Sequence, residues 1–186
     1  MNESAEELET LQLLLDRSAA GGRRHLTDIV EPQRQLSAER LCAELRGVVV
    51  LNVATVTNRG EPRLSAVDGH FLHGHWYFST AGSAVKAGHL MRRPAISVGY
   101  TPRDGYGVWA HGVAVRLAGD AAAAIDRYLS TLYGQPLSAL ADEIAIYRVD
   151  AHWMVGFAMT EPEMAQFEAT LPERDARIPA ALAALG

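Results

Sequence analysis

The sequence predicts a mainly β protein of the α+β class, in which antiparallel strands form a barrel with helices packed outside it. Three observations lead to this prediction. Segments rich in β-branched and aromatic residues fill the middle of the chain, tight turns join most of them, and few helices separate them. A parallel sheet would instead alternate strands with helices throughout. The seven short strands expected from the sequence can close a barrel of modest bore that has no exposed edge.

Two helices are expected before the strands. Leucines at positions 8, 11, 14 and 15 give residues 3–16 a helical spacing behind an acidic first turn, and Gly21 and Gly22 end this helix. A second helix is expected from Ser37, as its N-cap, to Arg46. Neither helix can bury its apolar face alone, so residues 1–46 are interpreted as an N-terminal helical arm and not as a separate domain.

Residues 47–160 are interpreted as the barrel domain. The run 48–57 is almost continuously β-branched or small and apolar, which is typical of a buried strand. Asn58–Glu61 is a turn signal, 62–72 reads as the return strand, and the turn at His73-Gly74 leads into a third strand, 75–80.

The rest of the barrel is expected to alternate helices with pairs of strands. The elements expected after the third strand are a short helix closed by Pro94, strands 95–100 and 108–117, a helix over 121–133, and strands 144–149 and 153–158. Residues 161–186 read as a weakly helical, alanine-rich tail that Pro172 and Pro179 interrupt.

Composition limits the classes of function. A chain of 186 residues suits one domain with a core, and a net charge of −5 without a basic stripe argues against general nucleic-acid binding. The one cysteine, Cys42, excludes an internal disulfide and a cysteine-built zinc site, and its place on an arm helix favours a buried, inert thiol.

The acidic first residues do not resemble a secretory signal, and no apolar run approaches the ~20 residues that cross a bilayer. We therefore expect a cytoplasmic protein without membrane contact.

The most informative segment is 76–94, where a strand ends in Ser79 and Thr80, crosses a small-residue turn and enters a short helix. Free amides at the start of a helix, several hydroxyls and the ammonium of Lys86 together can hold a phosphate. With Ser83 as the N-cap, Lys86 lies near the third helical position, where the helix dipole disfavours a cation. A bound anion would relieve that repulsion. The alternative is a surface lysine whose stem lies along apolar neighbours.

The strand 62–72 adds a second candidate group. A period of two places Arg63, Ser65 and Val67 on one face and Leu64, Ala66 and Asp68 on the other. Arg63 can bind a phosphate through two parallel hydrogen bonds, although an exposed arginine at a strand start is the alternative. The next strand ends at the anion-binding segment, so the fold brings the two regions together.

Other candidates carry less weight. His70, His73 and His75 cluster around a turn, but they lack the further ligands that a metal needs, so no metal site is expected. Trp76, Trp109 and Trp153 lie in predicted strands, where core or dimer-interface packing is the ordinary role. Trp109 or Trp153 could instead flank a planar ring. Ser65 and Asp68 could form a catalytic triad with a distant histidine, but any chain of this size offers such a combination, so this candidate carries little weight.

With these motifs the chain resembles the pyridoxamine 5'-phosphate oxidase-like superfamily, the flavin-binding split β-barrels. The resemblance covers about residues 41–118 and consists of the runs 48–57, 60–67, 76–80 and 83–90, followed by Arg93-Pro94. It implies an antiparallel split β-barrel and a homodimer that builds two cofactor sites between its subunits.

The resemblance also implies roles for individual residues. The arginine of the second strand assists the cofactor phosphate, the backbone of Ser65–Val67 lies against the flavin ring, and Lys86 grips the phosphate. The cofactor-binding residues expected in this way are Arg63, Leu64, Ser65, Ala66, Val67, Ser79, Thr80, Ser83 and Lys86. No proton-transfer residue stands out, so the catalytic residues are left unassigned.

One departure from the family keeps the cofactor open. Members that bind FMN often carry Ser-Arg-Lys at the helix start, whereas this chain has Ser83-Ala84-Val85-Lys86. The first expectation is an FMN-dependent oxidoreductase acting on a small molecule. The alternatives are a reductase that uses the deazaflavin coenzyme F-420, and a non-catalytic protein that binds a flavin or haem.

Overall fold

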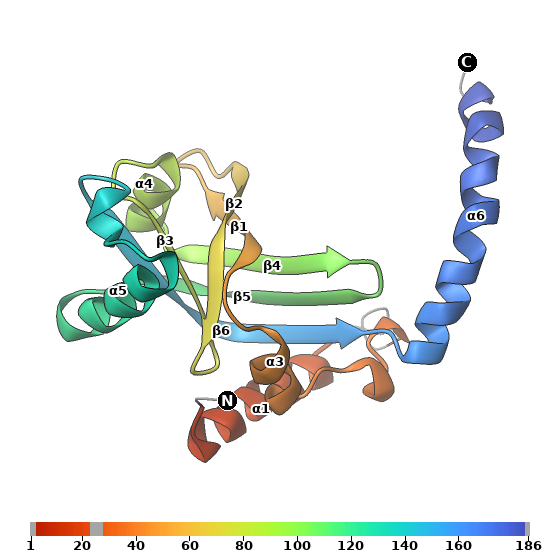
Figure 1. Ribbon diagram of the computed structural model, residues 1–186, viewed down its shortest axis with the longest axis horizontal. Helices are drawn as coiled ribbons and strands as arrows, with labels where there is room; N and C mark the ends of the chain where they lie inside the picture. The colour runs from red at the N-terminus through yellow and green to blue at the C-terminus, as the bar shows by residue number, and fades with distance from the viewer. Residues whose placement is uncertain (1–2, 23–27, 185–186) are drawn as a thin grey trace.

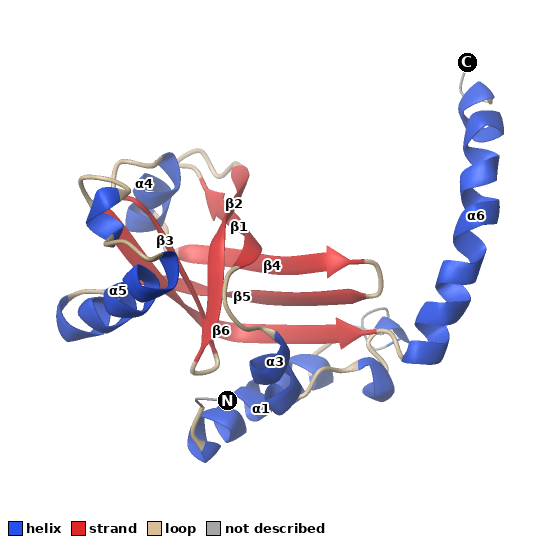
Figure 2. Cartoon of the chain, in the orientation of Figure 1, coloured by secondary structure: helices blue, strands red, loops and turns tan. Residues whose placement is uncertain are grey.

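The computed structural model describes residues 3–22 and 28–184 and contains a closed antiparallel barrel of six strands in the order β1-β2-β3-β6-β5-β4 (Figure 1). The predicted fold class is therefore confirmed. The strands are β1 (Val49–Val56), β2 (Pro62–Leu72), β3 (His75–Ala81), β4 (Ala95–Arg103), β5 (Tyr106–Arg116) and β6 (Ile144–Ala158). The helices are α1 (Ala5–Ala20), α3 (Ala38–Glu44), α4 (Val85–Arg92), α5 (Gly119–Tyr133) and α6 (Glu161–Ala183), with short 3-10 turns at Pro32–Arg34 and Leu137–Ala139. Figure 2 shows the helices around the outside of the strands.

The last strand corrects the sequence interpretation. Two strands were expected, 144–149 and 153–158, but β6 is continuous from Ile144 to Ala158. Its register against β5 shifts where His111 pairs with Trp153 and the next residue, Gly112, pairs with Ala151. One extra residue, His152, thus forms a bulge that bends the strand without ending its pairing. For this reason the barrel has six strands and not seven.

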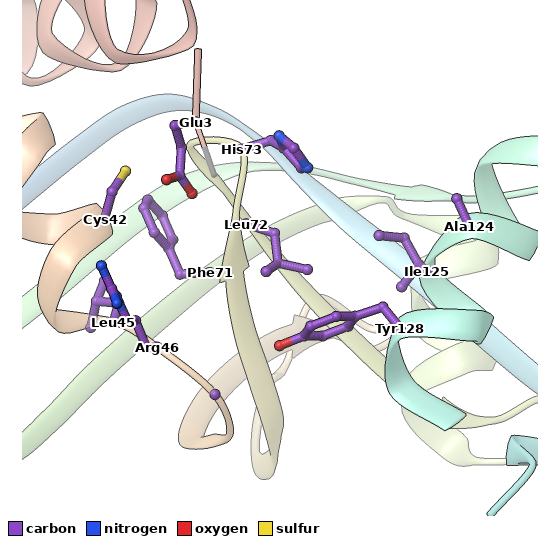
Figure 3. Close-up of a pocket in the computed structure, with 11 residues that line it drawn as sticks. Glu3, Cys42, Leu45, Arg46, Phe71, Leu72, His73, Ala124, Ile125 and Tyr128 are labelled. Atoms are coloured by element: carbon purple, nitrogen blue, oxygen red, sulfur yellow. The ribbon is translucent and has the colours of Figure 1, made fainter. Parts of the chain in front are cut away.

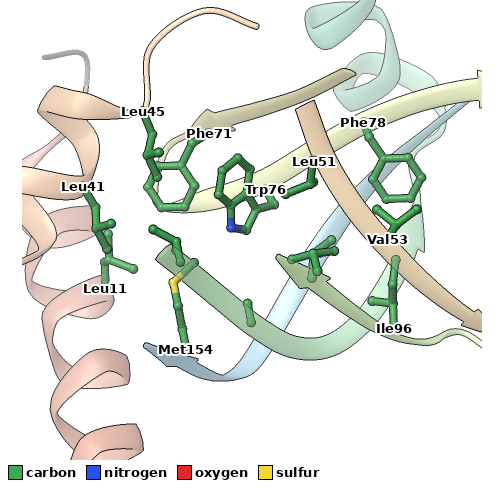
Figure 4. Packing of buried hydrophobic residues seen from close by; sticks show 14 of the residues in the cluster. Leu11, Leu41, Leu45, Leu51, Val53, Phe71, Trp76, Phe78, Ile96 and Met154 are labelled. Atoms are coloured by element: carbon green, nitrogen blue, oxygen red, sulfur yellow. The ribbon is translucent and has the colours of Figure 1, made fainter. Parts of the chain in front are cut away.

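Apolar side chains fill the barrel, and the N-terminal helices close one end of it. Leu51, Val53 and Phe78 are fully buried inside the barrel, and Leu11 of α1 and Leu41 of α3 belong to the same cluster (Figure 4). The arm therefore contributes to the same core as the strands, as expected of helices that cannot bury their apolar faces alone.

Local signals set the bounds of the first two helices. Ser4 caps α1 in a capping box with Glu7, which was not predicted. Ser37 caps α3 by accepting a hydrogen bond from the amide of Arg40, as predicted. The end of α1 is tied to the barrel, because the amide of Met154 in β6 donates to the buried Ser18 Oγ over 2.9 Å.

The C-terminal helix differs from the predicted interrupted tail. Helix α6 is continuous through Pro172 and Pro179 and runs away from the barrel (Figure 1). Each proline removes one backbone hydrogen bond, but the surrounding alanine, glutamate and leucine residues favour helix. An ion pair of 2.6 Å between Arg34 and Glu163 anchors the first turn. Across the described residues, no helix is both long and apolar enough to cross a bilayer.

Strands β2 and β3 part after a short pairing. They pair at four positions, from Leu72 opposite His75 to Gly69 opposite Phe78. Beyond Gly69, β2 continues with β1, while β3 continues with β6. Gly69 is buried against Leu51, and a Cβ at this position would lie 2.5 Å from the Leu51 Cβ. A glycine inside a strand often marks such a close approach, so Gly69 lets β2 lie tightly against Leu51 of β1 at the point where β2 and β3 part.

We predict that Gly69→Ala destabilises the fold by roughly 2–3 kcal/mol, because Leu51 is fully buried and its Cβ cannot move aside. Urea unfolding followed by circular dichroism measures the change. Gly88→Ala is the control. It lies in α4 with open space around its Cα, and alanine should stabilise the helix by about 0.5–1 kcal/mol. Equal stability of Gly69→Ala and wild type would contradict the packing described.

Candidate functional site

A cavity of about 500 Å³ lies in the opening where β2 and β3 part. Its walls come from strands β2 and β3, from the start of α4, and from the connection between α5 and β6. The lining residues are Ala66, Val67, Asp68, Ser79, Thr80, Lys86, Tyr133, Gln135 and Leu140. Its size is within the usual range for a small-molecule site, about 300–1,000 Å³, and charged and hydroxyl groups converge on it.

The strand β2 offers backbone groups to this opening. Between Pro62 and Asp68, β2 pairs with β1 alone, because β3 has already turned to β6. A strand edge without a neighbour presents a row of N–H and C=O groups that can bond another partner. These groups alternate donor and acceptor, which suits the edge of a planar heterocycle.

Helix α4 supplies the ammonium group. The helix begins at Val85 with Ala84 as its N-cap, so Ser83 does not cap it, contrary to the expectation, and Lys86 is the second helical residue. The Lys86 side chain is half-buried and makes no hydrogen bond or ion pair with the described residues. The Val85 and Lys86 amides have no intrahelical acceptor at this end of the helix. A cation close to these amides is disfavoured unless an anion joins them, so this end of the cavity suits a phosphate.

A chain of hydrogen bonds lies on the other side of the cavity. The Tyr133 hydroxyl donates to Asp68 Oδ2 over 3.0 Å and lies 3.2 Å from His70 Nε2. Burial and the Asp68 carboxylate raise the pKa of Tyr133 to about 12, so the hydroxyl stays protonated at neutral pH. The His70 side chain is 1% exposed, and burial lowers its pKa below the usual value, which keeps the ring neutral. Asp68 is thus the anionic member of this chain.

The structure brings together five of the nine predicted cofactor-binding residues: Ala66, Val67, Ser79, Thr80 and Lys86. The other four do not line the cavity. Arg63 is exposed and pairs with Glu61 over 2.8 Å, Leu64 and Ser83 are exposed, and Ser65 is half-buried in β2. A role for any of the nine in cofactor binding stays a prediction.

Sequence reasoning missed four lining residues. Asp68 had been placed on the strand without a role in the site, and Tyr133, Gln135 and Leu140 had been assigned to no site. The last three come from a connection far away in the sequence, and only tertiary packing places them beside β2. The one available signal was Gly134, whose left-handed φ of 69° ends α5 immediately after Tyr133.

The three histidines that cluster in the sequence contact three different partners in the structure. His70 contacts Tyr133, His73 Nδ1 lies 3.0 Å from Glu7 Oε1, and His75 Nδ1 lies 3.4 Å from the Val149 carbonyl oxygen. Within residues 3–22 and 28–184, no group of three histidine, cysteine or acidic side chains converges as a metal site would require.

A second cavity, of about 360 Å³, lies between α3, the β2–β3 hairpin and α5 (Figure 3). Cys42, Phe71, Leu72 and Tyr128 line it together with the polar side chains of Glu3, Arg46 and His73. It lacks the set of hydroxyls and unpaired ammonium that the first cavity offers. We therefore place the candidate site in the opening between β2 and β3.

The fold is shared with known structures at low sequence identity. A conserved hypothetical protein from Mycobacterium tuberculosis superposes with a TM-score of 0.59 and 18% identity, covering 69% of this chain and 89% of the other. A FAD-binding protein from Mesorhizobium loti gives 0.54 and 17%, covering 69% and 97%. An F420 reductase gives 0.50 and 19%, covering 60% and 93%.

These similarities define the class of fold. The chain shares the split β-barrel fold of these structures, which is the fold class that its sequence predicted. No protein-family model matches the sequence. No curated protein matches it either.

We predict that Cys42 resists alkylation in the native protein, because burial raises the pKa of its thiol to about 11 and the thiolate is the reactive form. The rate of reaction with iodoacetamide at pH 8 measures this. Because Cys42 is the one cysteine in the chain, mass spectrometry reads the result without ambiguity. The urea-unfolded protein is the control and should react fully, whereas equally fast labelling of native protein would contradict the burial.

Proposed function

We propose that the protein is a flavin-dependent oxidoreductase that binds FMN in the cavity between β2 and β3 and acts on a small molecule. The observation that carries the proposal is the half-buried, unpaired Lys86 in a cavity that also contains Ser79, Thr80 and the open edge of β2. An ammonium, two hydroxyls and free helix amides fit a phosphate, and a row of alternating backbone donors and acceptors fits the ring.

Each group has a separate task in this proposal. Lys86 forms a charge-assisted hydrogen bond with the phosphate, and Thr80 adds a neutral hydrogen bond, with Ser79 next to it on β3. The backbone of Ala66–Asp68 orients the ring, and Tyr133 and Leu140 shield it from water on the α5 side. When bound, the flavin supplies hydride transfer, while the protein provides binding, orientation and electrostatics.

A second candidate uses the deazaflavin coenzyme F-420 in the same cavity. The observation that favours it is the start of α4, where Ala84 is the N-cap and no side chain caps the helix. This start offers fewer phosphate ligands than a Ser-Arg-Lys sequence would. Similar folds have been described as an F420 reductase and as a FAD-binding protein, so both kinds of cofactor occur on this architecture.

Haem storage fits this cavity less well. Haem iron needs an axial ligand such as histidine, cysteine, methionine or tyrosine, and Tyr133 is the one such residue among those lining the cavity. Its raised pKa of about 12 and its hydrogen bond to Asp68 make it a poor ligand. A non-catalytic flavin carrier remains the alternative to an enzyme, and turnover of the reduced cofactor with an electron acceptor separates the two.

We further propose that the protein is a homodimer in the cytoplasm. Apolar side chains are exposed on the outer surface of the barrel, including Val50, Leu64, Trp109 and Val113. Trp109 lies against Gly107 and Gly99, where larger residues would displace it. Exposed apolar side chains on a barrel surface often mark an interface, and we propose that a second copy of the chain packs against them.

We predict that Lys86→Ala weakens FMN binding roughly 10- to 150-fold, which corresponds to the ~1.5–3 kcal/mol of a hydrogen bond to a charged group. Quenching of flavin fluorescence on titration measures the affinity. Arg92→Ala is the matched control, because it removes one positive charge from the same helix at an exposed position that does not line the cavity.

The purified protein gives the first test of the cofactor. A flavin-type visible spectrum supports FMN, a Soret band supports haem, and a colourless protein directs the titration to F-420. If Lys86→Ala and wild type bind FMN and F-420 equally, the cavity is not the phosphate site and the proposal fails.

A further inference from the structure

Two opposite charges line the candidate cavity without neutralising each other. Lys86 and Asp68 both face it, yet they do not form an ion pair within 4.0 Å, and Lys86 has no other partner among the described residues. An ammonium and a carboxylate free to move in one cavity would attract each other. Asp68 is instead hydrogen-bonded to Tyr133, and the cavity between the two charges is available to a ligand.

Tyr133 and His70 hold Asp68. The Tyr133 hydroxyl donates to Asp68 Oδ2, and His70, packed edge-on against Tyr128 and Tyr133, fixes the tyrosine from behind. In the described part of the chain, the other carboxylate oxygen, Oδ1, accepts no hydrogen bond from the protein. Asp68 is exposed, so Oδ1 is free to accept a hydrogen bond from a ligand donor such as a hydroxyl.

The order of residues along the opening separates the two charges. Asp68 and Ser79 are the first residues beyond the last β2–β3 pair, so they lie at the closed end of the opening. Lys86 follows the end of β3, after the turn that leads into α4. The neutral carboxamide of Gln135, which both donates and accepts, also lines the cavity. A ligand that fits must carry an anion at one point and hydroxyl groups at another.

Resting on the function proposed above, we propose that this cavity recognises a phosphorylated polyol, with Lys86 binding the phosphate and Asp68 accepting hydrogen bonds from the hydroxyls of the chain attached to it. Asp68 is then the specificity-determining residue, and Tyr133 and His70 are its positioning residues. The ribityl phosphate common to FMN and F-420 belongs to this class of ligand. Haem does not, because its propionates would meet the Asp68 carboxylate and it has no hydroxyl to donate.

Binding titrations of single variants test the roles of Asp68 and Lys86 separately. Three probes are titrated. FMN carries both the polyol and the phosphate, riboflavin carries the polyol without the phosphate, and inorganic phosphate carries no polyol. Asp68→Ala should weaken FMN and riboflavin by the same factor, about tenfold, because the hydroxyls lose a charged acceptor. It should not weaken inorganic phosphate. Lys86→Ala should show the opposite pattern, weakening FMN and phosphate but leaving riboflavin unchanged.

A second pair of variants tests the positioning role. Tyr133→Phe keeps the ring but removes the donor to Asp68, and we expect FMN and riboflavin affinity to fall about three- to tenfold. Tyr128→Phe is the matched control, since Tyr128 also packs on His70 but makes no hydrogen bond to Asp68, and it should bind FMN normally. Thermal unfolding of each variant shows that the fold is intact.

The outcomes distinguish this inference from the function on which it rests. If Lys86→Ala weakens FMN while Asp68→Ala and Tyr133→Phe leave FMN and riboflavin unchanged, the phosphate site stands and the polyol inference is overturned. If Asp68→Ala strengthens FMN binding, Asp68 opposes the ligand and the inference is again overturned. If wild-type protein binds neither FMN nor riboflavin, the FMN assignment falls and this inference falls with it.

Discussion

The separation of β2 from β3 after four paired positions is the constraint on which the rest of the site depends. Barrel strands bury their backbone groups by pairing on both edges, whereas β2 pairs with β1 up to Gly69 and with β3 only from Gly69 onward. The close approach of Gly69 to Leu51 marks the point of separation. From there the strand edge is open, and a cavity lined by charged and hydroxyl groups lies beside it.

The rest of the chain stabilises this opening without filling it. The N-terminal helices seal the far end of the barrel with leucines that join the main core, so the split does not expose the interior there. Helix α5 packs over β2 and ends at Tyr133, which connects the helix to the strand through Asp68 and His70. The same hydrogen bonds therefore support the fold and fix a charge in the cavity. Helix α4 completes the arrangement by presenting Lys86 at the other side.

Much of the fold could be predicted from the sequence, because local signals specify it. The expected return strand 62–72 is β2 residue for residue, and the serine cap of α3 is where the pattern indicated. The single β6 could not be foreseen, since a bulge at His152 looks like a break in the period of two. The expectation that Pro172 and Pro179 interrupt the C-terminal helix was also wrong, because α6 is continuous through both. In the site, Lys86 was accessible to sequence reasoning, whereas Tyr133 and Gln135 reach the cavity only through tertiary packing.

Amide hydrogen exchange along β2, followed by nuclear magnetic resonance with and without FMN, tests the central claim most directly. The account predicts that amides within residues 64–68 that do not bond β1 exchange fast in the free protein and slow down when FMN binds. The amides within residues 69–72 that bond β3 should be protected in both states. Protection that appears instead around Cys42 and Tyr128, or that leaves residues 64–68 unchanged, would contradict the account and place the ligand elsewhere.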